Sequence, residues 1–181
     1  MKLFYLVSLI FFSFQYTVSA QDAMPSENGV NVFDLARNGT LQQMDSLYTK
    51  TPYKIDSIDM RGFTPLILSC YRGSDEVAVF VAEHTKNINY SSDNGTALMA
   101  LVFKQNLELS KKLLDYGADP NMADKNGVTP LIYAIQFKNL PMVELLLEKG
   151  ADKSQKDATG KSPFEYAVFS KNQEIINLLK N

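Results

Sequence analysis

The residues best suited to catalysis are few in this sequence, and no motif arranges them for a reaction. His84 is the only histidine and Cys70 the only cysteine of the chain. A Ser–His–Asp triad would need His84 as its base, but no motif places a nucleophile beside it. We instead expect His84 to lie on the surface near the end of a helix, where it favours the negative end of the helix dipole.

The single cysteine also limits the other kinds of site. It excludes an intramolecular disulfide and a zinc cluster of cysteines and histidines. We expect Cys70 to be a buried, inert thiol, the alternative being a redox-sensitive thiol in an oxidising compartment. No phosphate-binding glycine loop, calcium loop or paired-carboxylate motif is present. The sequence therefore predicts a protein that is not an enzyme and that carries no cofactor and no metal.

The charge balance bears on the possible partners. The chain has 18 basic and 20 acidic residues, which gives a formal net charge of −2. A weakly acidic chain lacks the basic footprint that nucleic acid or an anionic membrane surface requires. With 45% hydrophobic residues, the composition is that of an ordinary globular protein. The length of 181 residues fits one domain preceded by a leader.

The N-terminus has the layout of a secretory signal peptide. Lys2 precedes an apolar run from Leu3 to Phe14, and small residues before position 21 fit cleavage after Ala20. The alternative is a membrane anchor, but a helix of this run spans about 18 Å, short of the roughly 30 Å hydrocarbon core. We therefore predict a signal peptide over 1–20 and a flexible lead-in over 21–29. The mature protein is then exported, periplasmic or secreted, with no membrane attachment.

An internal repeat with a period of about 33 residues fills the remainder of the chain. The segment "GVTPLIYA" with Thr129 is followed one period later by "GKSPFEYA" with Ser162, and "YGADPN" with Gly117 is followed at the same offset by "KGADKS" with Gly150. Each unit should open on an aspartate in a tight turn. We assign these aspartates as Asp59, Asp93, Asp124 and Asp157, with Asp93 one residue late because its turn is shorter.

These motifs resemble the ankyrin repeat, whose units open on a Thr-Pro-Leu motif and close on a Gly-Ala-Asp motif. The resemblance covers roughly 30–181, nearly the whole mature chain, and the chain looks like a small exported bacterial ankyrin-repeat protein. It implies an all-α solenoid of helix-turn-helix units joined by β-hairpin-like loops, with about five repeats including degenerate ends. The predicted repeats are 30–58, 59–91, 92–123, 124–156 and 157–181. The family's histidine after Thr-Pro-Leu is replaced by Ile67, Met99, Ile132 and Glu165.

The local chemistry of a unit supports the predicted helices. Threonine or serine before the first helix accepts hydrogen bonds from its free N–H groups, and the following proline has a φ suited to a helix start. The glycine that usually follows this helix is kept as Gly39 and Gly73 and is replaced elsewhere. Among non-glycine residues, asparagine tolerates the left-handed conformation best. We therefore expect the turn to be kept by the asparagine that follows each replaced glycine position: Asn106, Asn139 and Asn172.

The resemblance also implies where a partner binds, because ankyrin proteins generally use the hairpin tips and the exposed end of the first helix. At the helix ends these positions hold one aromatic residue per unit, and we predict that they form an aromatic ladder: Tyr71, Phe103, Phe137 and Phe169. Cations lie between them, among them Arg72 and Lys104. Phe63 and Val128 are expected to be exposed after the turn glycine, and Arg61 and Lys125 at the tips. The alternative is that the rings fold back onto neighbouring units and serve packing.

An exposed apolar stripe is costly unless something covers it, and aromatic residues and arginine dominate interface energetics. The sequence therefore predicts a monomeric protein-binding module acting outside the cytoplasm, for a partner with an acidic rim around an apolar patch. Two alternatives remain open at this point. One is an accessory or protective factor for an exported enzyme such as a catalase in peroxide defence, and the other is a secreted effector that binds host proteins.

Overall fold

The structure, a computed structural model, describes residues 31–72 and 74–180. The predicted signal peptide (1–20), the lead-in (21–29) and the expected helix-ending Gly73 lie outside the described residues. In the described part, helices follow one another in pairs joined by short turns. Their bounds are α2 (Val32–Asn38), α3 (Leu41–Lys50), the 3-10 helix η2 (Pro52–Asp56), α4 (Pro65–Arg72), α5 (Asp75–His84), α6 (Ala97–Lys104), α7 (Leu107–Asp115), α8 (Pro130–Gln136), α9 (Leu140–Glu148), α10 (Pro163–Ser170) and α11 (Gln173–Lys180).

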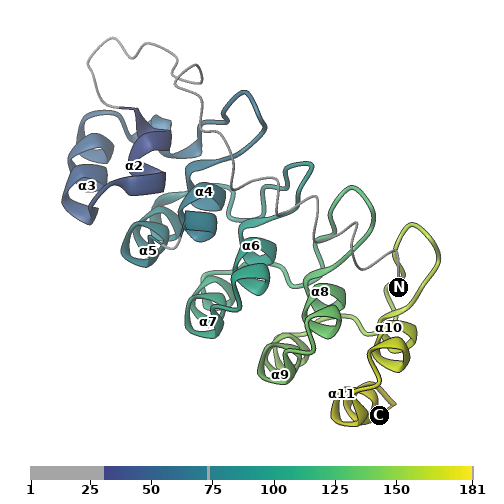
Figure 1. Cartoon of the computed structure of the whole chain (residues 1–181). Coiled ribbons are helices and arrows are strands. Elements are labelled where there is room, and N and C mark those ends of the chain that lie inside the picture. The colour runs from purple at the N-terminus through teal and green to yellow at the C-terminus, as the bar shows by residue number, and fades with distance from the viewer. Residues whose placement is uncertain (1–30, 73, 181) are drawn as a thin grey trace.

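The helices form two rows (Figure 1). The inner row stacks α2, α4, α6, α8 and α10, and the outer row stacks α3, α5, α7, α9 and α11. The apolar residues between the rows are completely buried, as at Leu131, Ile135 and Leu146. One unit cannot bury its own apolar face, so the contacts between successive units are the core. The predicted all-α solenoid is confirmed.

The loops between units are turns and contain no strand in the part of the chain that the structure describes. The one β-bridge found there is isolated and antiparallel, between Ser92 and Gly95. In the other units two backbone bonds close the turn, such as those from the Asp124 N–H to the Val128 carbonyl at 3.0 Å and from the Gly127 N–H to the Asp124 carbonyl at 2.9 Å. The loops thus reverse direction as a hairpin does, but they lack the paired strands of a β-hairpin.

The predicted helix caps are present at the start of the inner helices. In each case the side-chain oxygen accepts from the backbone N–H three residues later at 3.3 Å, at Thr64, Thr96, Thr129 and Ser162. Glu165 completes a capping box by accepting from the Ser162 N–H at 2.7 Å. Glu165 occupies the position that Ile67, Met99 and Ile132 hold in the other units, and its carboxylate is bonded at the start of its own helix.

After α6, α8 and α10 the turn is kept, but not by the residues we predicted. The left-handed conformation falls on Gln105, Lys138 and Lys171, with φ of 56°, 55° and 58°. The asparagines that follow cap the outer helices, since the Asn106 side chain accepts from the Leu109 N–H at 3.0 Å and Asn139 and Asn172 do the same in their units. Asparagine is favoured as a helix cap, and this role excludes the left-handed one. Gly39 is extended rather than left-handed, with φ of −79°.

The turn aspartates are correctly predicted in three units and wrongly in one. The Asp59, Asp124 and Asp157 side chains each accept two backbone N–H groups of their own turn. In the remaining unit this role belongs to Ser92, whose hydroxyl accepts from the Asn94 N–H at 3.2 Å. The Asp93 side chain is 83% exposed. Ser92 has the same spacing to the turn glycine Gly95 as Asp124 has to Gly127, whereas Asp93 comes one position later.

Asparagine side chains tie successive units together on the outer side. The Asn89 amide donates to the Gly117 carbonyl at 3.1 Å and accepts from the Asp119 N–H at 2.7 Å. Asn121 repeats this pair of bonds one unit later, with Gly150 and Asp152. These bonds satisfy backbone groups that the loops would otherwise leave without a protein partner. They fix the relative position of the units and therefore of the inner row.

Candidate protein-binding face

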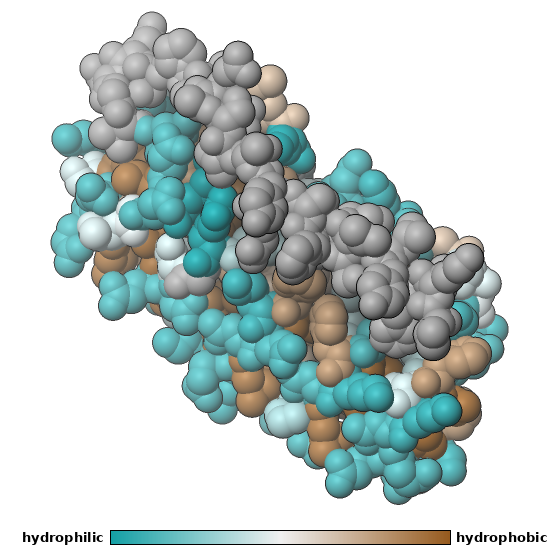
Figure 2. Space-filling model, viewed as in Figure 1, coloured by the Kyte–Doolittle hydropathy of each residue, from teal (hydrophilic) through white to brown (hydrophobic). Residues whose placement is uncertain are grey.

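The predicted ladder residues lie at the C-terminal ends of the inner helices. Tyr71, Phe103 and Phe137 are half-buried, whereas Phe169 is 68% exposed. Arg72 and Lys104, the last residues of α4 and α6, are exposed. An aromatic residue thus lies at the C-terminal end of α4, α6 and α10 and directly after α8, all of them helices of the inner row (Figure 1). Figure 2 shows apolar side chains between polar ones on the face that it presents.

The rings contribute to packing and keep part of their surface exposed. The Phe103 and Phe137 rings from neighbouring units meet edge to face, with centroids 5.7 Å apart. Phe137 also stacks on Tyr133 at 6.4 Å. Tyr71 meets Phe63 at 6.3 Å. The same rings therefore join neighbouring units and keep part of their surface exposed.

The prediction that Phe63 is exposed is wrong. Phe63 is only 3% exposed, because it packs under Tyr71, while Val128 at the equivalent position is half-buried. The tip residues Arg61 and Lys125 are exposed as predicted. The Arg61 guanidinium lies 5.8 Å from the centroid of the Phe63 ring, so the cation covers the aromatic residue at this tip. A residue after a turn glycine points inward or outward according to the neighbouring unit, which its own motif does not encode.

Two tyrosines that the sequence analysis missed connect the turns to the inner helices. The Tyr133 hydroxyl donates to Asp124 Oδ2 at 2.7 Å, and the Tyr166 hydroxyl donates to Asp157 Oδ2 at 2.5 Å. Burial and the aspartate bond raise the pKa of both tyrosines above the ordinary value. Each tyrosine therefore stays a neutral donor on this face. The signal was available, because aspartate and tyrosine have the same separation in both pairs and the pair recurs one repeat later.

In the turn before α10, the lysine Lys161 lies over two aromatic rings of that helix. Lys161 Nζ lies 4.9 Å from the centroid of Tyr166 and 5.0 Å from that of Phe169. Burial opposes ionisation of Asp157, but hydrogen bonds from Tyr166, Thr159 and the turn backbone lower its pKa below the usual value. The ionised carboxylate, the two rings and the lysine thus form one connected group at the C-terminal end of the face.

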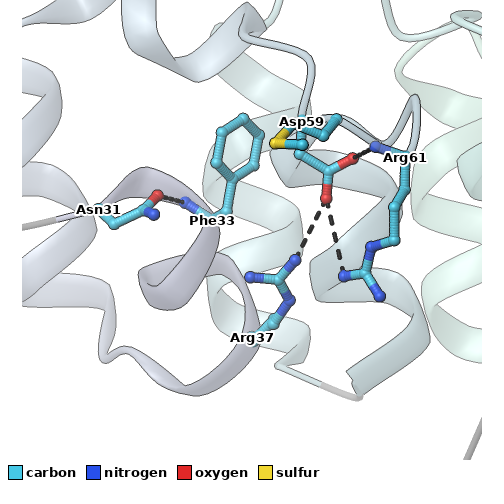
Figure 3. A pocket seen from close by; sticks show the side chains of 6 residues that line it. Asn31, Phe33, Arg37, Asp59 and Arg61 are labelled. Carbon is cyan, nitrogen blue, oxygen red and sulfur yellow. Dashed lines mark hydrogen bonds and ion pairs between the residues drawn. The ribbon is translucent and has the colours of Figure 1, made fainter. Parts of the chain in front are cut away.

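A pocket lies at the opposite end, between α2 and the turn before α4 (Figure 3). Arg37 donates to Asp59 Oδ2 at 3.2 Å, and the Arg61 guanidinium approaches the same oxygen at 3.8 Å. Asp59 thus accepts from Arg37 the kind of side-chain hydrogen bond that Asp124 and Asp157 accept from Tyr133 and Tyr166. Asn31, Phe33 and Met60 complete the lining. Met60 is 82% exposed, so an apolar side chain borders a carboxylate that two guanidinium groups flank.

Of the two residues considered for catalysis in the sequence, His84 lies on the outer row and Cys70 lies on α4 of the inner row. His84 is half-buried on α5, where its ring stacks on Phe80 at 4.3 Å and Nδ1 lies 2.7 Å from the Phe80 carbonyl. Cys70 is buried, as predicted, and burial raises the pKa of its thiol. Among the described residues no group of three or more histidines, cysteines and carboxylates is placed to hold a metal ion. The described helices are also too short or too polar to cross a membrane.

Comparison with known proteins agrees with the geometry. The family description "Ankyrin repeats (3 copies)" matches residues 32–124 and 99–181. The chain is 31% identical over 101 residues to "Ankyrin repeat and SAM domain-containing protein 6" of Rattus norvegicus, covering 55% of this chain and 11% of that protein. It is 38% identical over 74 residues to "BCL-6 corepressor-like protein 1" of Homo sapiens, covering 40% of this chain and 4% of that protein.

The similarity to these relatives is confined to the repeats, because the chain spans only a small part of the length of either protein. The family match covers nearly all of the described residues, and the two helix rows, the capped inner helices and the turns agree with it. The chain belongs to the ankyrin-repeat family.

Proposed function

We propose that this protein is a non-enzymatic interaction module that binds a protein partner through the inner row of helices and the tips of the turns. Ankyrin repeats in general act as protein-binding modules, which supports the proposal at the level of the family. The observation that carries it further is the aromatic ladder. Apolar ring surface remains exposed at the ends of the inner helices, most of all at Phe169 with 68%.

The position of the rings favours binding over packing as their main role. Rings needed only for packing would be fully covered, as Phe63 is. The ladder rings are instead half-buried or exposed and stand beside exposed cations such as Arg72 and Lys104. Aromatic side chains anchored by their neighbours lose little conformational entropy on binding, and such residues dominate the energetics of interfaces.

The binding proposal is tested by removing the exposed rings. Partners are first captured from the native compartment with the mature chain and identified by mass spectrometry, and their affinity is then measured by calorimetry. Phe169→Ser, and separately Tyr71→Ser with Phe103→Ser and Phe137→Ser, are expected to weaken binding at least about tenfold, a loss of roughly 1.4 kcal/mol. The cause is the loss of apolar area that the partner covers.

The matched control is Tyr53→Ser, which removes an aromatic ring that is 72% exposed on η2, outside the ladder. Its affinity should equal that of the unaltered protein. Because Phe169 is largely exposed, its variant should fold normally by circular dichroism even if the triple variant does not. Unchanged affinity of a folded Phe169→Ser variant and of a folded triple variant would contradict the proposal.

We also propose that the protein acts after export, in the periplasm or outside the cell. The support is the sequence before Gln21, where Lys2, the apolar run and Ala20 follow the pattern of a cleaved leader. Expression of the full chain in its native host should yield a mature protein that begins at Gln21 by mass spectrometry and that is found in the exported fraction. Recovery of the intact chain from the cytoplasm would refute this proposal.

A further inference from the structure

We propose that the partner binds this face with an extended, acidic polypeptide segment that carries apolar side chains. This inference rests on the proposed function and specifies the chemistry of the partner. It depends on the distribution of charge around the inner helices, which differs from the net charge of −2 of the whole chain. The face is lined by exposed cations although the chain as a whole is weakly acidic.

The cations form two groups at opposite ends of the inner helices. We call the residues at the C-terminal ends the cation strip: Arg72, Lys104, Lys138 and Lys171, all of them exposed. Arg61 and Lys125 lie on the turns that precede α4 and α8, at the N-terminal ends of those helices. The ladder residues lie beside the strip at the C-terminal ends of the inner helices, and Arg61 and Lys125 lie at the opposite ends.

The acidic residues of the same region are mostly occupied within the protein. Asp124 and Asp157 are 8% and 7% exposed, and both oxygens of each accept hydrogen bonds from their own unit. Asp59 is bonded in the same way to its turn and to Arg37. On the inner helices and the turns before them, the exposed carboxylates are Asp34, which pairs with Arg37 at 3.4 Å, Asp93, which lies 3.9 Å from Lys125, and Glu165, which caps α10. Further exposed carboxylates follow the strip in the first turns of the outer helices: Asp75, Glu76, Glu108 and Glu174. On the inner helices and their turns, a partner therefore meets more exposed cations than exposed carboxylates.

The aromatic ladder and the pocket of Figure 3 indicate the form of the partner. The ladder runs along successive units, so a segment laid across them meets an apolar patch and a cation at each step. At one end Arg37 and Arg61 flank a single carboxylate beside Met60 and Phe33 (Figure 3). Arg37 is paired with Asp34 and Asp59 and its side chain is 14% exposed, whereas the Arg61 side chain is 42% exposed. Arg61 is therefore the guanidinium at this end that an acidic side chain of the partner can reach.

Two other anionic partners fit the structure less well. Nucleic acid and anionic membranes are both recognised by dense basic surfaces, whereas the cations here are spaced along the units and the net charge of the chain is negative. Acidic side chains can lie beside the cations while apolar side chains cover the rings. A polypeptide with both is the partner that matches both features of the face.

A library of random twelve-residue peptides displayed on phage tests the inference, with the folded mature chain as target. We expect the enriched peptides to carry a negative mean charge together with aromatic or aliphatic residues. Reversing the charge of two residues of the cation strip, by Lys104→Glu and Lys138→Glu, should remove the enrichment of acidic peptides. A synthesised enriched peptide should bind this variant at least about tenfold more weakly at low salt, since exposed charges interact within a Debye length.

The matched control reverses two exposed lysines on the outer row, Lys111→Glu and Lys112→Glu on α7, and makes the same change in net charge. This variant should select acidic peptides as the unaltered chain does. No enrichment, or enrichment of neutral or basic peptides, overturns the inference, as does an equal effect of the outer-row reversal. So does binding to phosphatidylserine vesicles that depends on the strip.

The outcome separates the two proposals. Peptides that are not acidic but whose binding is lost in the Phe169→Ser variant would leave the aromatic face as a binding site and remove only the charge preference. Acidic peptides whose binding survives both Phe169→Ser and the triple ladder variant, but not strip reversal, would retain the charge preference and contradict the proposed role of the ladder.

Discussion

Replacing Asp124 by alanine is expected to lower the free energy of unfolding by roughly 3 kcal/mol or more. The Asp124 carboxylate accepts from the Asn126 and Val128 N–H groups at 2.8 and 2.9 Å and from the Tyr133 hydroxyl at 2.7 Å. Alanine removes the acceptor for all three donors, and Tyr133 is only 9% exposed. A buried donor without an acceptor costs about 1–3 kcal/mol. Urea unfolding followed by circular dichroism measures the effect.

The control for this prediction is Asp93→Ala, because the sequence pattern alone assigns Asp93 the same role. The Asp93 side chain is 83% exposed, and its ion pair with Lys125 at 3.9 Å is a surface contact. Such pairs contribute about 0–1 kcal/mol, so the variant should unfold nearly as the unaltered protein does. Equal losses of unfolding free energy in the Asp93 and Asp124 variants would contradict the stabilising role of the Asp124 hydrogen bonds to its turn and to Tyr133.

Gly127→Ala is expected to destabilise the protein more than the same change at Gly160, although both glycines occupy equivalent turns. Gly127 has a φ of 73°, and a Cβ there would lie 2.7 Å from the backbone nitrogen of Ala158 in the next unit. That nitrogen donates to the Asn126 carbonyl at 2.9 Å, so backbone from two units meets at this point. The added methyl group must therefore push the units apart, at a cost of roughly 2–4 kcal/mol with the backbone strain included.

At Gly160 the φ is 81° and an added Cβ meets nothing within 4 Å. Only the left-handed strain of an alanine remains, about 1–2 kcal/mol. The difference between the two variants isolates the contact between units from the turn conformation that they share. Thermal unfolding of the pair provides the measurement, and similar melting temperatures would indicate that the units do not approach each other closely at Gly127.

Much of the fold follows from the sequence by itself, because its determinants are local and repeat. Thr129 and Ser162 cap their helices through groups only three residues away, and the turn at Asp124 closes within the next four. Interactions of such short range depend on a handful of neighbouring residues. The repeat then reproduces them in successive units and specifies the stack of paired helices. The same spacing predicted the ends of the inner helices as the place of the ladder residues.

Only the tertiary structure decided which of these side chains stay accessible, because the burial of a side chain depends on the neighbouring unit. Phe63 is buried and Phe169 is exposed, although both belong to positions that the pattern predicts as exposed. Ser92 rather than Asp93 bonds the shorter turn, since the chain path selects the residue that points inward. Gly127 and Gly160 occupy the same position of the motif, but only at Gly127 would an added Cβ meet the backbone of the next unit. The residues of one unit determine its own turns and helices, while the contacts between units determine which surface a partner can reach.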